Sequence, residues 1–145
     1  MNVLEIRQGI AEKVSEIPNV RALHSWPTSP SQLGTQTLMV LLPDDPYVEF
    51  PEGSGRPSKL VVHLRLVALP LPGMGVERVQ DELDELISFG SGETRSVLSK
   101  LREDISAGGA ACAVWPLDVS VRSFPFGEVE AVGAEFRLRV IARGA

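Results

Sequence analysis

The chain has few of the residues that usually carry chemistry. Its 145 residues include one cysteine, Cys112, and two histidines, His24 and His63. A single cysteine excludes an intramolecular disulfide. Zinc ligands normally occur as closely spaced Cys and His pairs, and these three residues stand far apart. We therefore expect no metal site. Cys112 has no flanking cation, so we expect a small buried residue rather than a nucleophile.

Long apolar runs and a targeting segment are also missing. No apolar stretch approaches the roughly 20 residues that span a bilayer, and no basic segment with a following apolar run marks a signal peptide. The formal net charge of -5 argues against a surface that binds nucleic-acid phosphates. With 43% hydrophobic and 23% charged residues, the composition is that of a globular protein. We expect one domain over residues 1–145, made in the cytoplasm and kept there or packed into something assembled there.

Motifs for catalysis or cofactor binding are absent as well. The segment Gly73-Met74-Gly75 precedes a helix pattern but lacks the lysine and the glycine spacing of a phosphate-binding loop. Ser91 lies between two glycines with no strand before it, which predicts a helix cap rather than a nucleophile. Four carboxylates are spread around one helix and predict a solvated face: Asp81, Glu82, Asp84 and Glu85. We therefore predict no catalytic residue and no cofactor.

The most regular pattern is a pair of helices between strand-like runs. Apolar residues recur at helical spacing over 76–89, then Gly90-Ser91-Gly92 interrupts the pattern. A second stripe of Val97, Leu98, Leu101 and Ile105 predicts a helix over 93–104. A further helix begins near Val3 and is ended by Pro18.

Strand patterns occupy most of the remaining chain. Apolar runs and alternation predict strands at 37–42, 59–69, 113–121 and 132–142, with a weak strand within 19–26. One face of the 59–69 strand is fully apolar. The other face is mixed, as in an antiparallel sheet that is half-open to water or to a partner. The last strand places Glu135, Arg137 and Arg139 outward.

These elements predict an α+β fold with a mostly antiparallel sheet of four to five strands and helices packed on one face. The shared apolar faces predict the core. Its expected members are Ile6, Ile10, Val14, Leu64, Leu66, Val79, Leu83, Leu86, Leu98, Leu101, Phe136 and Leu138.

Residues 43–58 predict a long loop or a splayed hairpin arm. The segment holds four of the eleven prolines and two glycines. Tyr47, Val48 and Phe50 lie among these turn formers. Two interpretations remain: a mobile loop whose aromatic residues fold back on the domain, or an arm that meets a neighbouring subunit.

Several pieces along nearly the full chain carry a family resemblance. They are the helix ending at Ile17-Pro18, the Trp26-Pro27 loop, Leu42-Pro43-Asp44 followed by Tyr47 and Arg56, the Leu83–Ile87 run with Gly90-Ser91-Gly92, the Ser96–Leu101 run, and the extended end over 133–141. Together they resemble the tail terminator (tail completion) proteins of long-tailed bacteriophages, especially those of actinobacterial phages. The family is held together by this layout more than by invariant residues.

The resemblance implies a fold, an assembly and a role. The fold is a small domain with helices on one face of a mostly antiparallel sheet. The assembly is a ring of copies of the chain, usually a hexamer, stacked on the last ring of tail-tube protein. The role is to end tube polymerisation and to join the tail to the head connector, in the virion, while DNA passes through the ring without specific binding. The resemblance implies no cofactor, no catalytic residue and no membrane partner.

Closed rings use heterologous interfaces, so two different patches are needed. The candidate patches are the 43–58 segment, the mixed sheet face and the terminal segments. The candidate assembly contacts are Tyr47, Val48, Phe50, Arg56, Arg65, Arg137 and Arg139.

Two alternatives remain open at this point. A head-closure or connector protein of the phage neck has a similar size and also forms rings, but it binds the portal or adaptor rather than the tube. A small cytoplasmic α+β enzyme is less favoured, and a pocket with converging polar side chains would indicate it.

Overall fold

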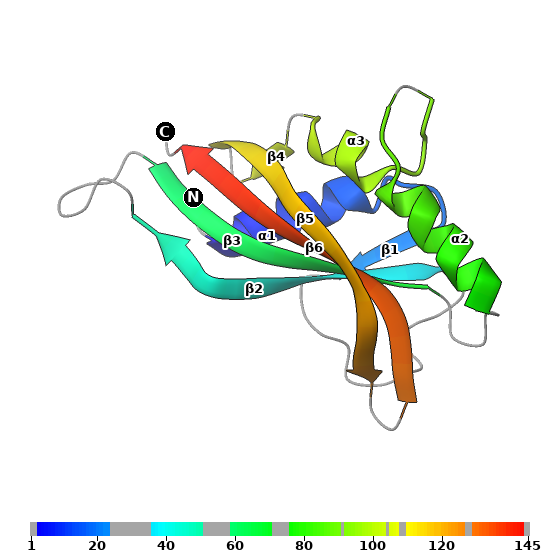
Figure 1. Cartoon of the computed structure of the whole chain (residues 1–145). Coiled ribbons are helices and arrows are strands. Elements are labelled where there is room, and N and C mark those ends of the chain that lie inside the picture. Colours follow the sequence, from blue (N-terminus) through cyan, green and yellow to red (C-terminus); the bar gives the residue numbers. More distant parts are fainter. Residues whose placement is uncertain are drawn as a thin grey trace.

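The computed structural model describes residues 3–23, 36–50, 59–70, 76–90, 92–103, 105–107, 110–126 and 129–143. Three helices and six strands follow one another in these residues (Figure 1). In chain order they are α1 (Val3–Val14), β1 (Val20–Leu23), β2 (Thr37–Glu49), β3 (Lys59–Leu69), α2 (Val76–Ile87), α3 (Val97–Leu101), β4 (Ile105–Ala107), β5 (Ala110–Phe126) and β6 (Val129–Arg143).

The strands form one sheet in the order β1-β2-β3-β6-β5-β4. The short β1 runs parallel to β2, and every other neighbouring pair is antiparallel. The centre is the β3–β6 pair, which stays in register from Lys59↔Arg143 to Ala68↔Ala134. The predicted class, an α+β fold with a mostly antiparallel sheet, is confirmed.

The sheet has one strand more than the sequence predicted. The helix predicted over 93–104 ends early, and the chain after it forms the additional strand. Helix α3 ends at Leu101, and Ile105 begins β4 instead of extending the helix. Strand β4 pairs with the first residues of β5, from Ile105↔Cys112 to Ala107↔Ala110. Ile105, which fitted the predicted helical stripe, thus belongs to the strand at the edge of the sheet.

Strand β2 continues past Pro43, which directly follows the predicted strand 37–42, and strand β5 contains Pro116. In β2 the register shifts between Pro43 and Val48, after which pairing resumes at Val48↔Val62 and Glu49↔Val61. A second shift lies between Pro116 and Asp118 in β5. Such bulges absorb the residues that cannot donate to the ladder. Of the two predicted forms, a long loop is therefore wrong for residues 43–49, which belong to one arm of the β2–β3 hairpin. Residues 51–58 lie outside the described part of the chain.

The β5–β6 hairpin is also longer than predicted. Residues 123–126, which lie between the predicted strands 113–121 and 132–142, are strand residues that pair from Ser123↔Val132 to Phe126↔Val129. In Figure 1 this hairpin extends past the helices as the lower end of the molecule.

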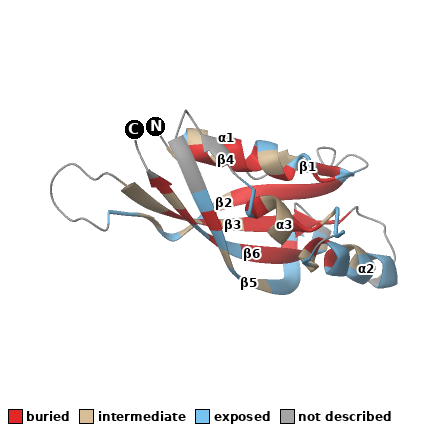
Figure 2. Cartoon of the chain, turned by 90° about the horizontal axis from the view of Figure 1, so that it is seen from above, coloured by how far each residue is buried: buried red, intermediate tan, exposed pale blue. Residues whose placement is uncertain are grey.

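The main core lies between the helices and the face of the sheet beneath them, here called the inner face (Figure 2). Helix α1 contributes Ile6, Ile10 and Val14, and α2 contributes Leu83 and Leu86, all fully buried. The central strands meet them with residues such as Leu64, Leu66, Phe136 and Leu138. All twelve predicted core residues belong to this cluster, with Val79 and Leu98 half-buried at its margin.

The break between α2 and α3 uses two glycines in the left-handed region, Gly90 at φ 119° and Gly92 at φ 92°. Side chains other than glycine rarely adopt these angles. The N-cap of α3 is Ser96, whose side chain accepts a hydrogen bond from the Ser99 N–H at 3.2 Å. Ser91, predicted as the cap, lies outside the described residues, and the helix begins later than predicted.

Candidate functional site

The face of the sheet that is turned away from the three helices, here called the outer face, holds three of the seven predicted assembly residues: Arg65, Arg137 and Arg139. None of the helices in the described part of the chain covers it (Figure 1). Along the strands, the outer face changes from buried apolar residues, through a zone of ion pairs, to an exposed zone.

A small apolar cluster occupies the end of the outer face nearest β1. Leu38, Val40, Val67, Leu69 and Phe124 are buried in it. The backbones of β3 and β6 approach each other closely at Gly133. A Cβ at this position would lie 2.5 Å from the Ala68 carbonyl oxygen, so only glycine fits. The sequence predicted a mixed outer face but did not predict this buried cluster. It arises because apolar residues from β2, β3 and β5 meet only in the folded register.

The middle zone is organised around a buried carboxylate. Glu135 is 8% exposed and lies between two arginines on the neighbouring strands. It accepts hydrogen bonds from Arg65 Nη1 at 3.0 Å and from Arg122 Nη2 at 2.8 Å. Two cations offset the cost of removing the carboxylate from water. Glu135 does face outward as predicted, but these pairs keep it buried.

Arg137 makes looser pairs in the same zone. It lies 3.0 Å from Asp118 on β5 and 3.6 Å from Asp44 on β2, and about half of its side chain is exposed. Exposed pairs of this kind contribute about 0–1 kcal/mol to stability. These ion pairs mainly fix the positions of the charged side chains across β2, β6 and β5.

The exposed zone contains an arginine without an acidic partner. No carboxylate in the described residues lies within ion-pair distance of Arg139, which is exposed to solvent. In the ladder Arg139 stands between His63 on β3 and Trp115 on β5. Trp115 is 58% exposed, and His63 Nε2 lies 3.1 Å from Glu49 Oε1. An exposed indole beside a free guanidinium is the main surface feature that sequence reasoning missed.

The predicted assembly residues thus divide into different roles. Arg65 and Arg137 are held in ion pairs, and Arg139 is free among the described residues. Arg56 lies outside the described part of the chain. The regular alternation of β6 located Arg137 and Arg139, but Trp115 is separated from them in sequence and meets them only through the β5–β6 register.

The apolar residues of the 43–58 segment do not behave as one group. Tyr47 and Val48 are half-buried and pack against the main core. Packing against the domain, which one of the two interpretations expected of the aromatic residues, is therefore found for Tyr47, because the bulge after Pro43 returns the chain to the sheet. Phe50, just past the end of β2, is 56% exposed and stays available for contact.

Helix α2 carries a carboxylate that the sequence placed on a solvated face. Glu82 pairs with Arg95 through both oxygens, with Arg95 Nη1 2.6 Å from Oε2. Thr37 donates to the same carboxylate at 2.8 Å, and Arg95 Nε donates to the Pro18 carbonyl oxygen at 3.0 Å. The Arg95 hydrogen bonds hold the pKa of Glu82 below its ordinary value, against the opposing effect of burial. The network joins α2, the α2–α3 connection, β2 and the turn after α1.

The other carboxylates of α2 agree with the prediction of a solvated face. Asp81, Asp84 and Glu85 are exposed, as is Glu77 one turn earlier. Figure 2 shows this outer side of α2 as largely exposed. The only basic residue of the helix is Arg78.

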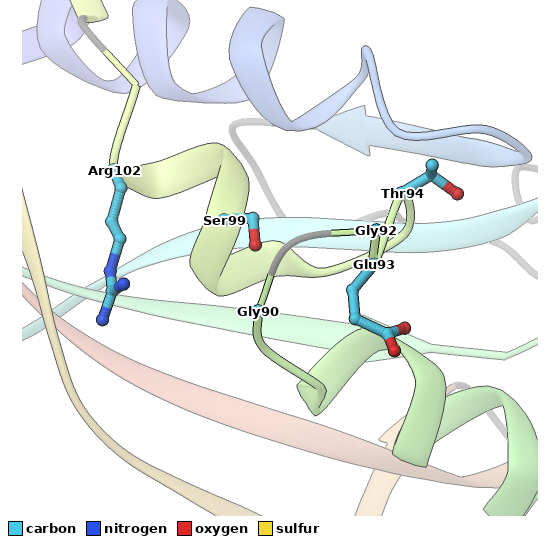
Figure 3. A pocket seen from close by; sticks show the side chains of 6 residues that line it. All are labelled: Gly90, Gly92, Glu93, Thr94, Ser99 and Arg102. Carbon is cyan, nitrogen blue, oxygen red and sulfur yellow. The ribbon is translucent and has the colours of Figure 1, made fainter.

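A surface hollow of roughly 440 Å³ lies beside the α2–α3 connection (Figure 3). Its lining residues are Gly90, Gly92, Glu93, Thr94, Ser99 and Arg102. The labelled side chains spread apart: Thr94 points away from Ser99, and Arg102 lies on the far side of α3 from Glu93. This arrangement does not bring a nucleophile, a base and an orienting group together.

The described residues contain no group of three or more His, Cys, Asp or Glu side chains placed to hold a metal ion. The remaining candidates from the sequence lie largely outside the residues that the structure describes. His24 and the 73–75 segment are not among the described residues, and Cys112 is described only as a backbone position in β5 that pairs with Ile105.

A scan against protein-family models found no match, and a search of curated proteins found no similar sequence. Within the described residues, no helix has both the length and the apolar character to cross a bilayer.

Proposed function

We propose that this chain is a structural protein that forms a ring at the top of a phage tail, where it ends tail-tube polymerisation and joins the tail to the head connector. The observation that carries the proposal is the outer face of the sheet. Within the described residues it lacks a helical layer and ends in an exposed zone that holds Trp115 and Arg139, an arginine without an ion pair in that part of the chain.

A surface of this composition fits protein–protein contact. Tryptophan and arginine are enriched in the energetically dominant parts of interfaces. Termination needs only such a surface, because a ring that binds the last tube ring on one side and presents a different surface on the other stops further addition. No chemical step is required for this role.

The arrangement of the elements supports the same assignment. The α+β layout, with consecutive helices α2 and α3 before two long final strands, agrees with the resemblance to tail terminators. The long β2–β3 and β5–β6 hairpins give the subunit extended surfaces for neighbours. The net charge of -5 suits a ring through which DNA passes without binding.

Deleting the gene from its phage and imaging the lysate tests the role. We expect overlong or unjoined tails beside filled heads, because nothing then stops tube growth. Supplying the intact gene in trans should restore normal tails. Tails of normal length that are fully joined to heads would contradict the proposal.

The same images distinguish the neighbouring neck role. Heads that leak their DNA beside tails of normal length would indicate a head-closure protein, since such a protein seals the portal rather than the tube.

A further inference from the structure

We propose that two specific surfaces make the contact between neighbouring copies: an exposed patch on the outer face of one copy and the acidic outer side of α2 on the next. The patch, here called the Trp115 patch, consists of Val61, Ala113, Trp115, Arg139 and Ile141. This inference rests on the proposed self-assembly and names the surfaces that would carry it.

The Trp115 patch is continuous across the three strands β3, β6 and β5. Val61, Ile141 and Ala113 stand opposite one another in the ladder and form an apolar row. The next row on the same face holds Arg139 and Trp115. Ala113, Trp115 and Arg139 are exposed, while Val61 and Ile141 are half-buried. An apolar row beside a cation and an indole resembles the composition of an interface core.

The polar groups of the patch select an acidic partner. A guanidinium and an indole N–H both donate hydrogen bonds and accept none. Arg139 has no carboxylate within ion-pair distance in the described residues, although the chain as a whole carries a charge of -5. Lys59, on the same face at the β3 end, adds a second positive charge near the apolar row. A partner surface rich in carboxylates satisfies these donors.

The outer side of α2 offers such a surface. Glu77, Asp81, Asp84 and Glu85 are exposed on it, and Arg78 is the one cation of the helix. Arg95 pairs with Glu82 and, at 3.5 Å, with Glu85. No ion pair within the described residues neutralises Glu77, Asp81 or Asp84. The two surfaces have opposite charge and do not contact each other within one copy in any ion pair of the described residues.

The Trp115 patch is on the sheet and the acidic side of α2 is in the helical layer, so the contact joins two different surfaces. Such a contact is heterologous: each copy uses its patch for one neighbour and its α2 for the other. It leads to a ring when the rotation between copies closes. A symmetric dimer made by one surface twice is excluded by this arrangement.

Sedimentation of the purified full chain at low ionic strength, up to millimolar protein, tests the contact. Arg139→Asp and Asp81→Arg should each weaken self-association by about tenfold or more, because each brings like charges together. Arg102→Asp, a reversal at an exposed arginine that belongs to neither surface, should leave association unchanged. Thermal melts of each variant check that the fold is intact.

Mixing the two variants gives the sharpest result. The Arg139→Asp chain keeps a native α2, and the Asp81→Arg chain keeps a native Trp115 patch, so a mixed pair forms one native contact between these two surfaces. The two substituted surfaces again carry opposite charges, so we expect the mixture to associate more strongly than either variant alone. A wild-type chain that stays monomeric at millimolar concentration, variants that associate as the wild type does, or a mixture that remains monomeric would overturn the proposal. The gene-deletion images decide the tail-terminator role independently of these results.

Discussion

The two faces of the sheet differ in how far their apolar residues are buried and in how their charged residues are paired. On the inner face, side chains from α1, α2 and α3 bury an almost entirely apolar set, and the Glu82–Arg95 pair lies at its margin. On the outer face, one end is a small buried cluster, the middle is an ion-pair zone around Glu135, and the far end exposes Trp115 and Arg139. The inner face stabilises the subunit. The far end of the outer face leaves an indole and a guanidinium exposed to solvent after folding.

This difference separates residues that hold the domain together from residues available to a partner. The same strand contributes to both: in β6, Phe136 and Leu138 are buried in the core, while Arg137 and Arg139 face outward. Alternation along a strand makes this division possible, because successive side chains point to opposite faces. Substitutions on the two faces should therefore affect different measurements.

The largest effect is expected on the inner face. Leu83→Ala should lower the free energy of unfolding by about 2–5 kcal/mol, since it removes a fully buried side chain and leaves a cavity. Urea unfolding followed by circular dichroism measures the loss. Leu4→Ala is the control, because Leu4 lies on α1 with 48% of its surface exposed. A loss below about 1 kcal/mol for Leu83→Ala would show that α2 does not close the core.

An intermediate effect is expected at the margin of the inner face, and it should depend on pH. Glu82→Gln should cost about 1–2 kcal/mol at neutral pH, because Arg95 and Thr37 lose a charged acceptor. The pKa of Glu82 is lowered in the folded protein. Its contribution is therefore complete above the pKa of an unfolded glutamate and is lost as pH falls through the lower folded value.

The pH dependence provides the check for this prediction. The stability difference between wild type and Glu82→Gln should shrink between neutral pH and about pH 3 in urea unfolding series. Glu12→Gln, at an exposed position of α1, should show little difference at either pH. A difference that stays constant with pH would mean that ionisation of Glu82 does not stabilise the fold.

The smallest effect on stability is expected where β2 leaves the sheet. Phe50→Ser should change the free energy of unfolding by less than about 0.5 kcal/mol, because Phe50 is 56% exposed. If the segment is an assembly contact, the same change should weaken ring formation or tail attachment. Tyr47→Ser is the matched comparison and should cost about 1 kcal/mol or more, since Tyr47 packs against the core. Equal losses of unfolding free energy for the two variants would contradict this prediction, because they would show that Phe50 packs as tightly as Tyr47.

The fold was predictable to the extent that it depends on local periodicity. The apolar stripes of α1 and α2 and the alternation over 59–69 and 132–142 located the core and the α+β class correctly. The strand ends were predicted less well. Proline is a local signal for a turn, but bulges after Pro43 and Pro116 let β2 and β5 continue, and that outcome depends on the neighbouring strand.

The candidate site was predictable only in part. Arg65, Arg137 and Arg139 were placed on the outer face from the pattern of their own strands. Trp115 was not associated with them, because no local pattern states which residue of β5 stands opposite Arg139.

The sequence by itself determined which residues are apolar, at what spacing they recur, and therefore which stretches are helix or strand. Only the tertiary structure decided which charges are paired. Arg65 reaches Glu135 across 70 residues of chain, and Arg95 reaches Glu82 from the far side of the α2–α3 connection. Periodicity is a property of a segment, whereas an ion pair, a buried carboxylate or a free arginine is a property of the register between segments. That register is fixed by the packing of the whole domain.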